Sequence, residues 1–260
     1  MELFAGELRR LRSGAGLSQE ALAEKISYSA SLVAAVEQCR RPPQLEFAQQ
    51  CDQVLGSEGL LLRIREVCIR ESLVPWFREW AAIEREARAL RTFQPLVIPG
   101  LLQTADYARG MYEGGTPLTA DELDQIVLGR LTRQEILESS RPPLLVAVID
   151  YSVLERPVGG PKIMREQLLH LAEAATRPFV HVHVIPRGVG GYLGLGGPFV
   201  LATAPDGADM AYLDNQLKGM SVDGVEELRY LRDAWECVRA DALPQRQSHA
   251  LIAEAANQWT

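Results

Sequence analysis

Apolar residues at helical spacing predict a run of short helices in the first 70 residues. Phe4, Leu8 and Leu11 share one helical face, and the Ser13-Gly14-Ala15-Gly16 stretch ends that segment. Serines fit the N-cap positions of the next two helices. The remaining predicted boundaries are a second helix from Ser18 to about Ile26, a third from Ser29 to Arg40-Arg41-Pro42-Pro43, a fourth over about Leu45 to Leu55, and a fifth from near Gly59.

The rest of the chain mixes helical and strand patterns. Helical spacing predicts helices over 76–91, 104–112, 121–139, 162–175, 225–240 and 245–256. Apolar or alternating runs predict strands over 144–149, 179–185, 199–203 and 210–213. The strand–helix–strand unit 144–185 predicts a parallel crossover, and the later strands predict an antiparallel meander. We therefore expect an α-helical N-terminal domain, residues 1–70, and an α+β C-terminal domain with a small mixed sheet, residues 71–260.

The second and third predicted helices have the spacing of a helix-turn-helix, in which the third helix enters the major groove of DNA. Free N–H groups at the start of the second helix can hold a phosphate, and two side-chain donors lie there. Two arginines follow the third helix, where they can contact the DNA backbone. The predicted DNA-binding residues are Ser18, Gln19, Ser29, Ala30, Ser31, Ala34, Arg40 and Arg41.

The stretches Leu8 to Arg12, Gly16 to Ala23, and Val33 to Glu37 followed by Arg40-Arg41-Pro42 resemble the Cro-like, xenobiotic-response-element (XRE) family of helix-turn-helix domains. That family usually carries Arg, Gln, Asn or Lys at some outward positions of the third helix. Here these positions hold only alanine and serine: Ala30, Ser31, Ala34 and Ala35. Bidentate pairing with guanine or adenine is therefore excluded at these positions, and recognition would depend on DNA shape and on the arginines.

Cys39 is a second departure from the family pattern, which usually has glycine in the turn after the third helix. A cysteine beside two arginines has the surroundings of a redox switch. A tolerated surface substitution is the simpler interpretation.

Charge and composition restrict where DNA can bind. Residues 1–70 hold nine basic and nine acidic residues, whereas residues 71–260 hold 18 basic and 25 acidic ones and account for the net charge of −7. A DNA contact is thus expected in the N-terminal part. The four cysteines have no metal-like spacing and predict free thiols. With no long apolar run and no signal-peptide pattern at the start, a cytoplasmic protein without membrane contact is expected.

The C-terminal region resembles a domain of unknown function found after XRE-type domains in actinobacterial regulators of the Streptomyces type. The resemblance lies in Pro99-Gly100-Leu101-Leu102-Gln103-Thr104 above all, with Glu84 to Ala87, Tyr107-Ala108-Arg109, Arg130, Arg133-Gln134, Pro157 to Gly160, Gln167 to Leu171 and Val184-Ile185-Pro186. It implies a developmental or antibiotic-control regulator, often with a small partner protein in a toxin–antitoxin-like arrangement. Asp150-Tyr151-Ser152 departs from the Asp-Glu of that family, so a role for the glutamate is not carried over. The Pro99–Thr104 segment itself predicts a helix entry, with Thr104 as cap, or the wall of an effector pocket.

Features of an enzyme are few. His181 and His183 share one face of a predicted strand, and with Asp150 they are a weak candidate for a metal site. The glycine-rich stretch 188–197 has no phosphate-binding pattern and predicts a mobile connection or a lid. We expect no catalytic residues, no metal and no cofactor.

The sequence thus predicts a transcription regulator that binds double-stranded DNA as a homodimer, in the manner of this class. Its C-terminal domain would sense a small-molecule effector or bind a small partner protein. The alternative is an antitoxin-like interaction module whose helix-turn-helix is degenerate, which the Ala/Ser third helix favours.

Overall fold

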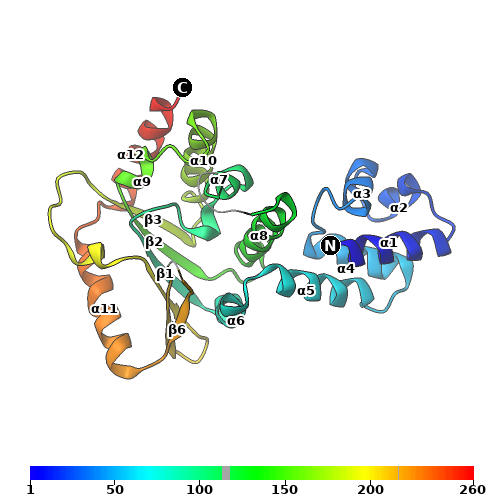
Figure 1. The fold of residues 1–260 in the computed structure, drawn as a ribbon, viewed down its shortest axis with the longest axis horizontal. Coiled ribbons are helices and arrows are strands. Elements are labelled where there is room, and N and C mark those ends of the chain that lie inside the picture. The colour runs from blue at the N-terminus through cyan, green and yellow to red at the C-terminus, as the bar shows by residue number, and fades with distance from the viewer. Residues whose placement is uncertain (113–117, 216) are drawn as a thin grey trace. The chain divides into compact units, whose positions relative to one another are not determined.

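A computed structural model describes residues 1–112, 118–215 and 217–260, without the side chains of residues 71 and 72. The chain divides into two compact units, Met1–Leu73 and Val74–Thr260 (Figure 1). The division falls three residues after the boundary expected from the sequence. Each unit has a hydrophobic core of its own.

The N-terminal unit is a bundle of five helices: α1(Glu2–Gly14), α2(Gln19–Lys25), α3(Ala30–Glu37), α4(Leu45–Leu55) and α5(Leu60–Ser72). Its core includes Phe4, Leu8, Leu22, Val33 and Phe47, none more than 1% exposed. The predicted number, order and approximate bounds of these helices are confirmed. Ser18 and Ser29 cap α2 and α3, as their positions predicted.

The C-terminal unit is built on a six-stranded mixed sheet with the order β3-β2-β1-β4-β5-β6. The strands are β1(Ala89–Gln94), β2(Leu144–Asp150), β3(Val180–Ile185), β4(Phe199–Thr203), β5(Asp209–Leu213) and β6(Met220–Val222). β2 pairs in parallel with β1 and β3, and β4 to β6 form an antiparallel meander that joins the sheet through β1. The parallel crossover and the meander were both predicted.

The central strand was not predicted. The helix expected over 76–91 is a short 3-10 turn, η1(Pro75–Phe77), followed by α6(Arg78–Glu86), and the chain then enters β1. Ala87 and Leu90 continue the helical spacing of Trp80 and Ile83, so periodicity alone extends the helix too far. Pairing with β2 on one side and β4 on the other sets the strand conformation instead. The short edge strand β6 was also missed.

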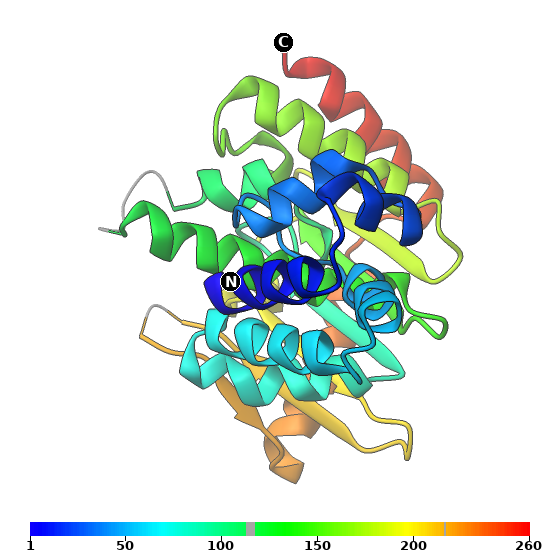
Figure 2. The same cartoon turned by 90° about the vertical axis from the view of Figure 1, so that its right-hand side faces the viewer.

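Helices cover both faces of this sheet. One face packs against α7(Ala105–Gly110), α9(Ser152–Glu155), α10(Pro161–Ala174) and α12(Gln245–Gln258), and the other against α11(Val225–Ala240). α10 and α12 lie side by side, as the second view shows (Figure 2). Side chains along β3 alternate between the two faces, and Val180, Val182 and Val184 are buried on the face that α10 and α12 cover. The helix predicted over 121–139 is α8(Ala120–Arg133) followed by the 3-10 helix η3(Gln134–Glu138). No helix among the described residues is long and apolar enough to cross a membrane.

Candidate functional site

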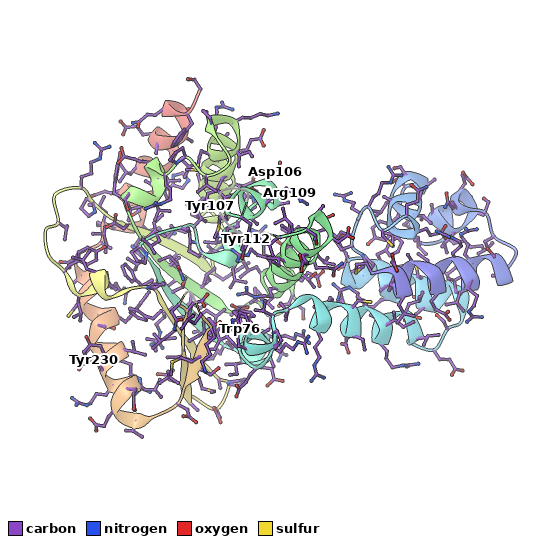
Figure 3. The ribbon with its side chains drawn as sticks, in the orientation of Figure 1. Trp76, Asp106, Tyr107, Arg109, Tyr112 and Tyr230 are labelled. Atoms are coloured by element: carbon purple, nitrogen blue, oxygen red, sulfur yellow. The ribbon has the colours of Figure 1, made fainter. Side chains whose placement is uncertain are left out.

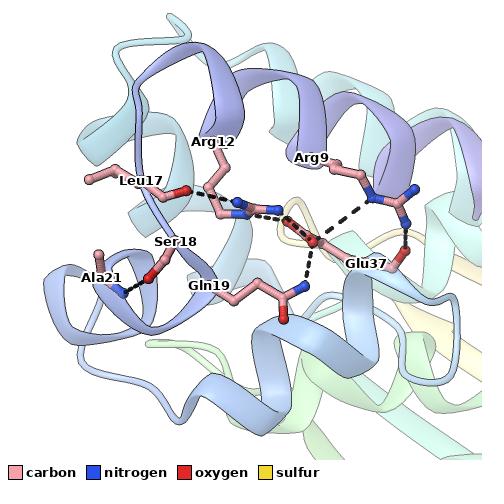
Figure 4. Close-up of polar contacts among 7 residues, drawn as sticks. All are labelled: Arg9, Arg12, Leu17, Ser18, Gln19, Ala21 and Glu37. Atoms are coloured by element: carbon pink, nitrogen blue, oxygen red, sulfur yellow. Dashed lines mark hydrogen bonds and ion pairs between the residues drawn. The ribbon is translucent and has the colours of Figure 1, made fainter.

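The helix-turn-helix is held together by a buried carboxylate at the end of α3. Glu37 is 2% exposed and accepts hydrogen bonds from Arg12 Nε (2.6 Å), Arg12 Nη2 (3.0 Å) and Gln19 Nε2 (2.6 Å) (Figure 4). Arg9 Nη2 donates to the backbone oxygen of Glu37 at 2.6 Å. Residues of α1, α2 and α3 therefore meet at one side chain, which fixes the angle between the two helices of the motif.

The ionised form of Glu37 is strongly favoured by these contacts. Burial alone would raise the pKa of Glu37, but the hydrogen bonds from Arg12 and Gln19 and the charges of Arg12 and Arg9 lower it below the ordinary value. No local pattern predicts this pairing, because Arg12 and Glu37 are 25 positions apart.

The predicted DNA-binding residues lie together around α2 and α3, but they differ in what they can offer. Ser18 Oγ accepts from the backbone N of Ala21 at 3.1 Å, and Ser29 Oγ accepts from that of Leu32 at 3.2 Å. Gln19 uses one amide proton on Glu37 inside the unit. Ser31 is exposed, whereas the three alanines of α3 are half-buried: Ala30, Ala34 and Ala35.

Arg40 and Arg41 are the exposed charges at the end of α3. Within the described part of the chain, neither side chain makes a hydrogen bond or an ion pair. Their backbone N–H groups both donate to Ala35 O, at 2.8 and 3.2 Å. The backbone is thus anchored while both guanidinium groups are available to a partner.

The first three helices end in the same way. Each helix is followed by a residue with positive φ. The N–H of this residue and the N–H of the next residue both donate to backbone oxygens in the last turn of the helix, which makes a Schellman motif. The residues are Gly16 (φ 69°), Ser27 (φ 59°) and Cys39 (φ 57°). Glycine is the residue that adopts this conformation without strain, so two of the three turns are strained.

Replacing Cys39 by glycine should therefore stabilise the N-terminal unit by about 1 kcal/mol, as should Ser27→Gly. Gly16→Ala is the matched control and should lose a similar amount, because an added Cβ at Gly16 meets no atom within 4 Å and only the backbone conformation changes. Urea unfolding of the three variants would measure these differences. A destabilised Cys39→Gly variant would show that the cysteine side chain makes a favourable contact.

In the C-terminal unit, three buried or half-buried glutamines hold the Pro99–Thr104 segment. Gln167 accepts from Thr104 N and donates to Leu102 O, each at 2.7 Å. Gln134 donates to Gly100 O (2.9 Å) and Gln103 O (2.7 Å), and Gln103 donates to Ile98 O (2.6 Å). Thr104 caps α7, as predicted. The segment, which includes the 3-10 turn η2(Gly100–Leu102), is thus an ordered loop that joins α7, α8 and α10.

A cluster of arginines lies beside this loop. Arg133 forms a bidentate ion pair with buried Glu84: Nε donates to Oε2 at 2.8 Å and Nη2 donates to Oε1 at 2.9 Å. The guanidinium carbon of Arg133 lies 4.1 Å from the centre of the Phe77 ring. Arg130, three residues earlier on α8, donates to Gln103 Oε1 at 2.6 Å and to Tyr112 OH at 3.2 Å. Figure 3 labels Tyr107 and Tyr112, which come from α7 and the residues just after it.

The two histidines of β3 and the glycine-rich stretch 188–197 make contacts within the C-terminal unit. His181 Nδ1 lies 2.7 Å from Gln245 Oε1, and His183 Nδ1 lies 3.0 Å from Leu243 O, so both rings are tied to the start of α12. The described residues hold no group of three potential metal ligands. The 188–197 stretch, predicted as a mobile connection or lid, is anchored: Tyr192 OH donates to Asp150 Oδ2 at 2.8 Å, and buried Gly194 packs against Phe93 so closely that a Cβ would overlap the ring.

Comparison with known families agrees with the two units. A helix-turn-helix domain model matches residues 3–63, and the model described as a domain of unknown function (DUF5753) matches residues 77–254. Neither the curated proteins nor the solved structures contain a significant match to the chain. Because the second match covers well over half of the sequence, the chain belongs to the DUF5753 family and carries a helix-turn-helix domain ahead of that family's domain.

Proposed function

We propose that this protein is a DNA-binding transcription regulator of the XRE type, without catalytic activity, that acts as a homodimer in the cytoplasm. The observation that carries the proposal is the free pair Arg40 and Arg41 at the end of a rigidly held α3. Two such units on one dimer would reach half-sites one helical turn apart. The C-terminal unit would change their spacing when it binds an effector or a partner protein.

The composition of α3 favours a second candidate, the antitoxin-like interaction module. Its outward positions hold Ala30, Ser31, Ala34 and Ala35, which can contact thymine methyl groups or form single hydrogen bonds only. A helix of this kind would bind DNA weakly without help from a partner. The two candidates differ in whether the purified protein prefers one DNA sequence.

The first test is the double substitution Arg40→Ala and Arg41→Ala. It should weaken binding to any DNA sequence and reduce the slope of log K against log salt concentration by up to about two, since each arginine would neutralise about one phosphate. Gel shifts of the full chain on the DNA upstream of its own coding sequence, in a salt series with random-sequence competitor, would measure this.

The matched control is Arg63→Ala with Arg70→Ala, which removes the same charge from exposed positions of α5. This variant should keep the wild-type slope. An unchanged slope for the Arg40/Arg41 variant would remove these residues from the interface. A shift that random DNA competes away equally would favour the interaction module.

A further inference from the structure

Arg130 is a half-buried cation, and it lacks a carboxylate partner among the residues that the structure describes. Within the ranges that the structure describes, no acidic side chain comes within ion-pair distance of its guanidinium, and its acceptors are all neutral: the oxygens of Gln103 and Tyr112 and, at 3.8 Å, the Met111 sulfur. Buried charges in proteins are normally paired, because desolvation costs more than neutral hydrogen bonds return. Arginine remains protonated in proteins, so the positive charge persists at this position.

A second arginine, Arg133, lies beside Arg130. Burial is the main cause that lowers the pKa of Arg130; Tyr112 raises this pKa, and the nearby charge of Arg133 lowers it. Glu84 neutralises Arg133 through Nε and Nη2. The Nη1 atoms of both arginines lie within 4 Å of the position that a Cβ of Gly100 would take. Because residue 100 is glycine, no side chain of its own separates the two guanidinium groups.

Two further groups affect Arg130 without pairing with it. Asp214 is exposed, and its charge acts on Arg130 from beyond ion-pair distance. The Tyr107 hydroxyl accepts from the backbone N of Ile98 and so faces the loop rather than the guanidinium. The net charge of Arg130, Arg133 and Glu84 is therefore positive, with Asp214 at the edge of the cluster.

We propose that Arg130, with Gln103, Tyr112 and Arg133 around it, binds the anionic group of a small ligand, a carboxylate or a phosphate. The planar fork of arginine matches the oxygens of both groups, and a neutral amide and a phenol hydroxyl orient the fork. The inference rests on the effector-sensing part of the proposed function and assigns the chemical class of the effector. An anion bound here would also act on α8 and on the Pro99–Thr104 loop, because Arg130 and Gln134 hydrogen-bond to Gln103.

The experiment is a thermal unfolding series of the full chain with inorganic phosphate, with acetate and with chloride, all at one ionic strength. The melting temperature should rise with phosphate or acetate relative to chloride, by about 3–5 °C at ten times the dissociation constant. A response to phosphate alone assigns a phosphorylated ligand, and a response to acetate alone assigns a carboxylate. No DNA is present, so failure here leaves the DNA-binding proposal untouched, and failure to bind DNA leaves this one untouched.

Substitutions decide whether the response comes from this cluster. Arg130→Met should abolish it, and Arg130→Lys should keep only part, because lysine retains the charge without the fork. Tyr112→Phe removes one hydroxyl from a half-buried ring and should weaken binding even if the Arg130 variants fold poorly. Arg141→Met, at an exposed position outside the cluster, should respond as the wild type does.

Asp214→Asn separates a bound ligand from an internal counter-ion. If the cluster binds an external anion, removing the charge of Asp214 should strengthen the response to that anion. If Asp214 neutralises Arg130 in solution, the substitution should instead lower the melting temperature in chloride, and the wild type should show no anion response. That second result, or equal responses in wild type and Arg130→Met, would overturn the proposal.

Discussion

Arg12→Ala should lower the free energy of unfolding of the N-terminal unit by about 3 kcal/mol. The substitution removes both guanidinium hydrogen bonds to Glu37 and the one to Leu17 O at 2.7 Å. Glu37 would then be a buried carboxylate with fewer partners, and breaking one side of a buried ion pair typically costs about 3–5 kcal/mol. The lower end of the range applies because Gln19 and Arg9 remain near Glu37.

Hydrogen exchange of the full chain would measure this loss for each unit separately. Amides of α1 to α3 should lose protection by about a hundredfold, while the sheet of the C-terminal unit should keep its protection. Arg10→Ala is the control in the same helix and should change little, because among the described residues Arg10 pairs with Glu7 alone, at the exposed surface. Equal effects of the two substitutions would show that the Glu37 contacts do not hold the motif together.

The same contacts predict a dependence on pH. The pKa of Glu37 is lowered in the folded state, so its contribution to stability is fully present above its unfolded pKa of about 4.3 and is lost as pH falls through the lower folded value. The N-terminal unit of the wild type should therefore lose stability as the pH falls below about 4. In Arg12→Ala this acid-induced loss should be shallower, because much of the shift in the pKa of Glu37 comes from Arg12.

The N-terminal fold could be predicted from sequence because its signals are local. Ser18 and Ser29 lie where the caps are, and the apolar spacing of each helix matches its buried face. The strained turns could be predicted only in part. Cys39 stands out as a departure from the family's glycine, whereas Ser27, in the same conformation, carries no such signal, because serine is common in turns.

There is a physical reason why the central strand could not be predicted. β1 carries Arg91 and Gln94 among its six residues and has no simple alternation, and its identity as a strand comes from two neighbours that are 50 or more positions away. The arginine cluster has the same origin. Gln103 and Arg130 are 27 positions apart, and only the packing of α8 against the Pro99–Thr104 loop brings them together.

That loop gives the last prediction, Gln167→Leu, which should destabilise the C-terminal unit by about 2–4 kcal/mol. Leucine fits the space of glutamine, but it leaves Thr104 N–H and Leu102 C=O without the partners they have in the wild type. Gln167 is fully buried, so its loss leaves two backbone groups unsatisfied, at a cost of about 1–3 kcal/mol each. The total is reduced because Thr104 is half-buried and water can hydrogen-bond to its N–H.

Glu166→Ala is the matched control, one residue earlier on α10 and exposed to solvent, and it should be nearly neutral. Urea unfolding followed by near-ultraviolet circular dichroism would compare the two. If Gln167→Leu unfolded at the wild-type midpoint, the loop would not depend on this glutamine, and the Pro99–Thr104 segment would have to be fixed by Gln103 and Gln134 alone. If instead the large loss is found, Gln167 positions the Pro99–Thr104 loop, and that loop in turn supplies Gln103 as the hydrogen-bond partner of Arg130.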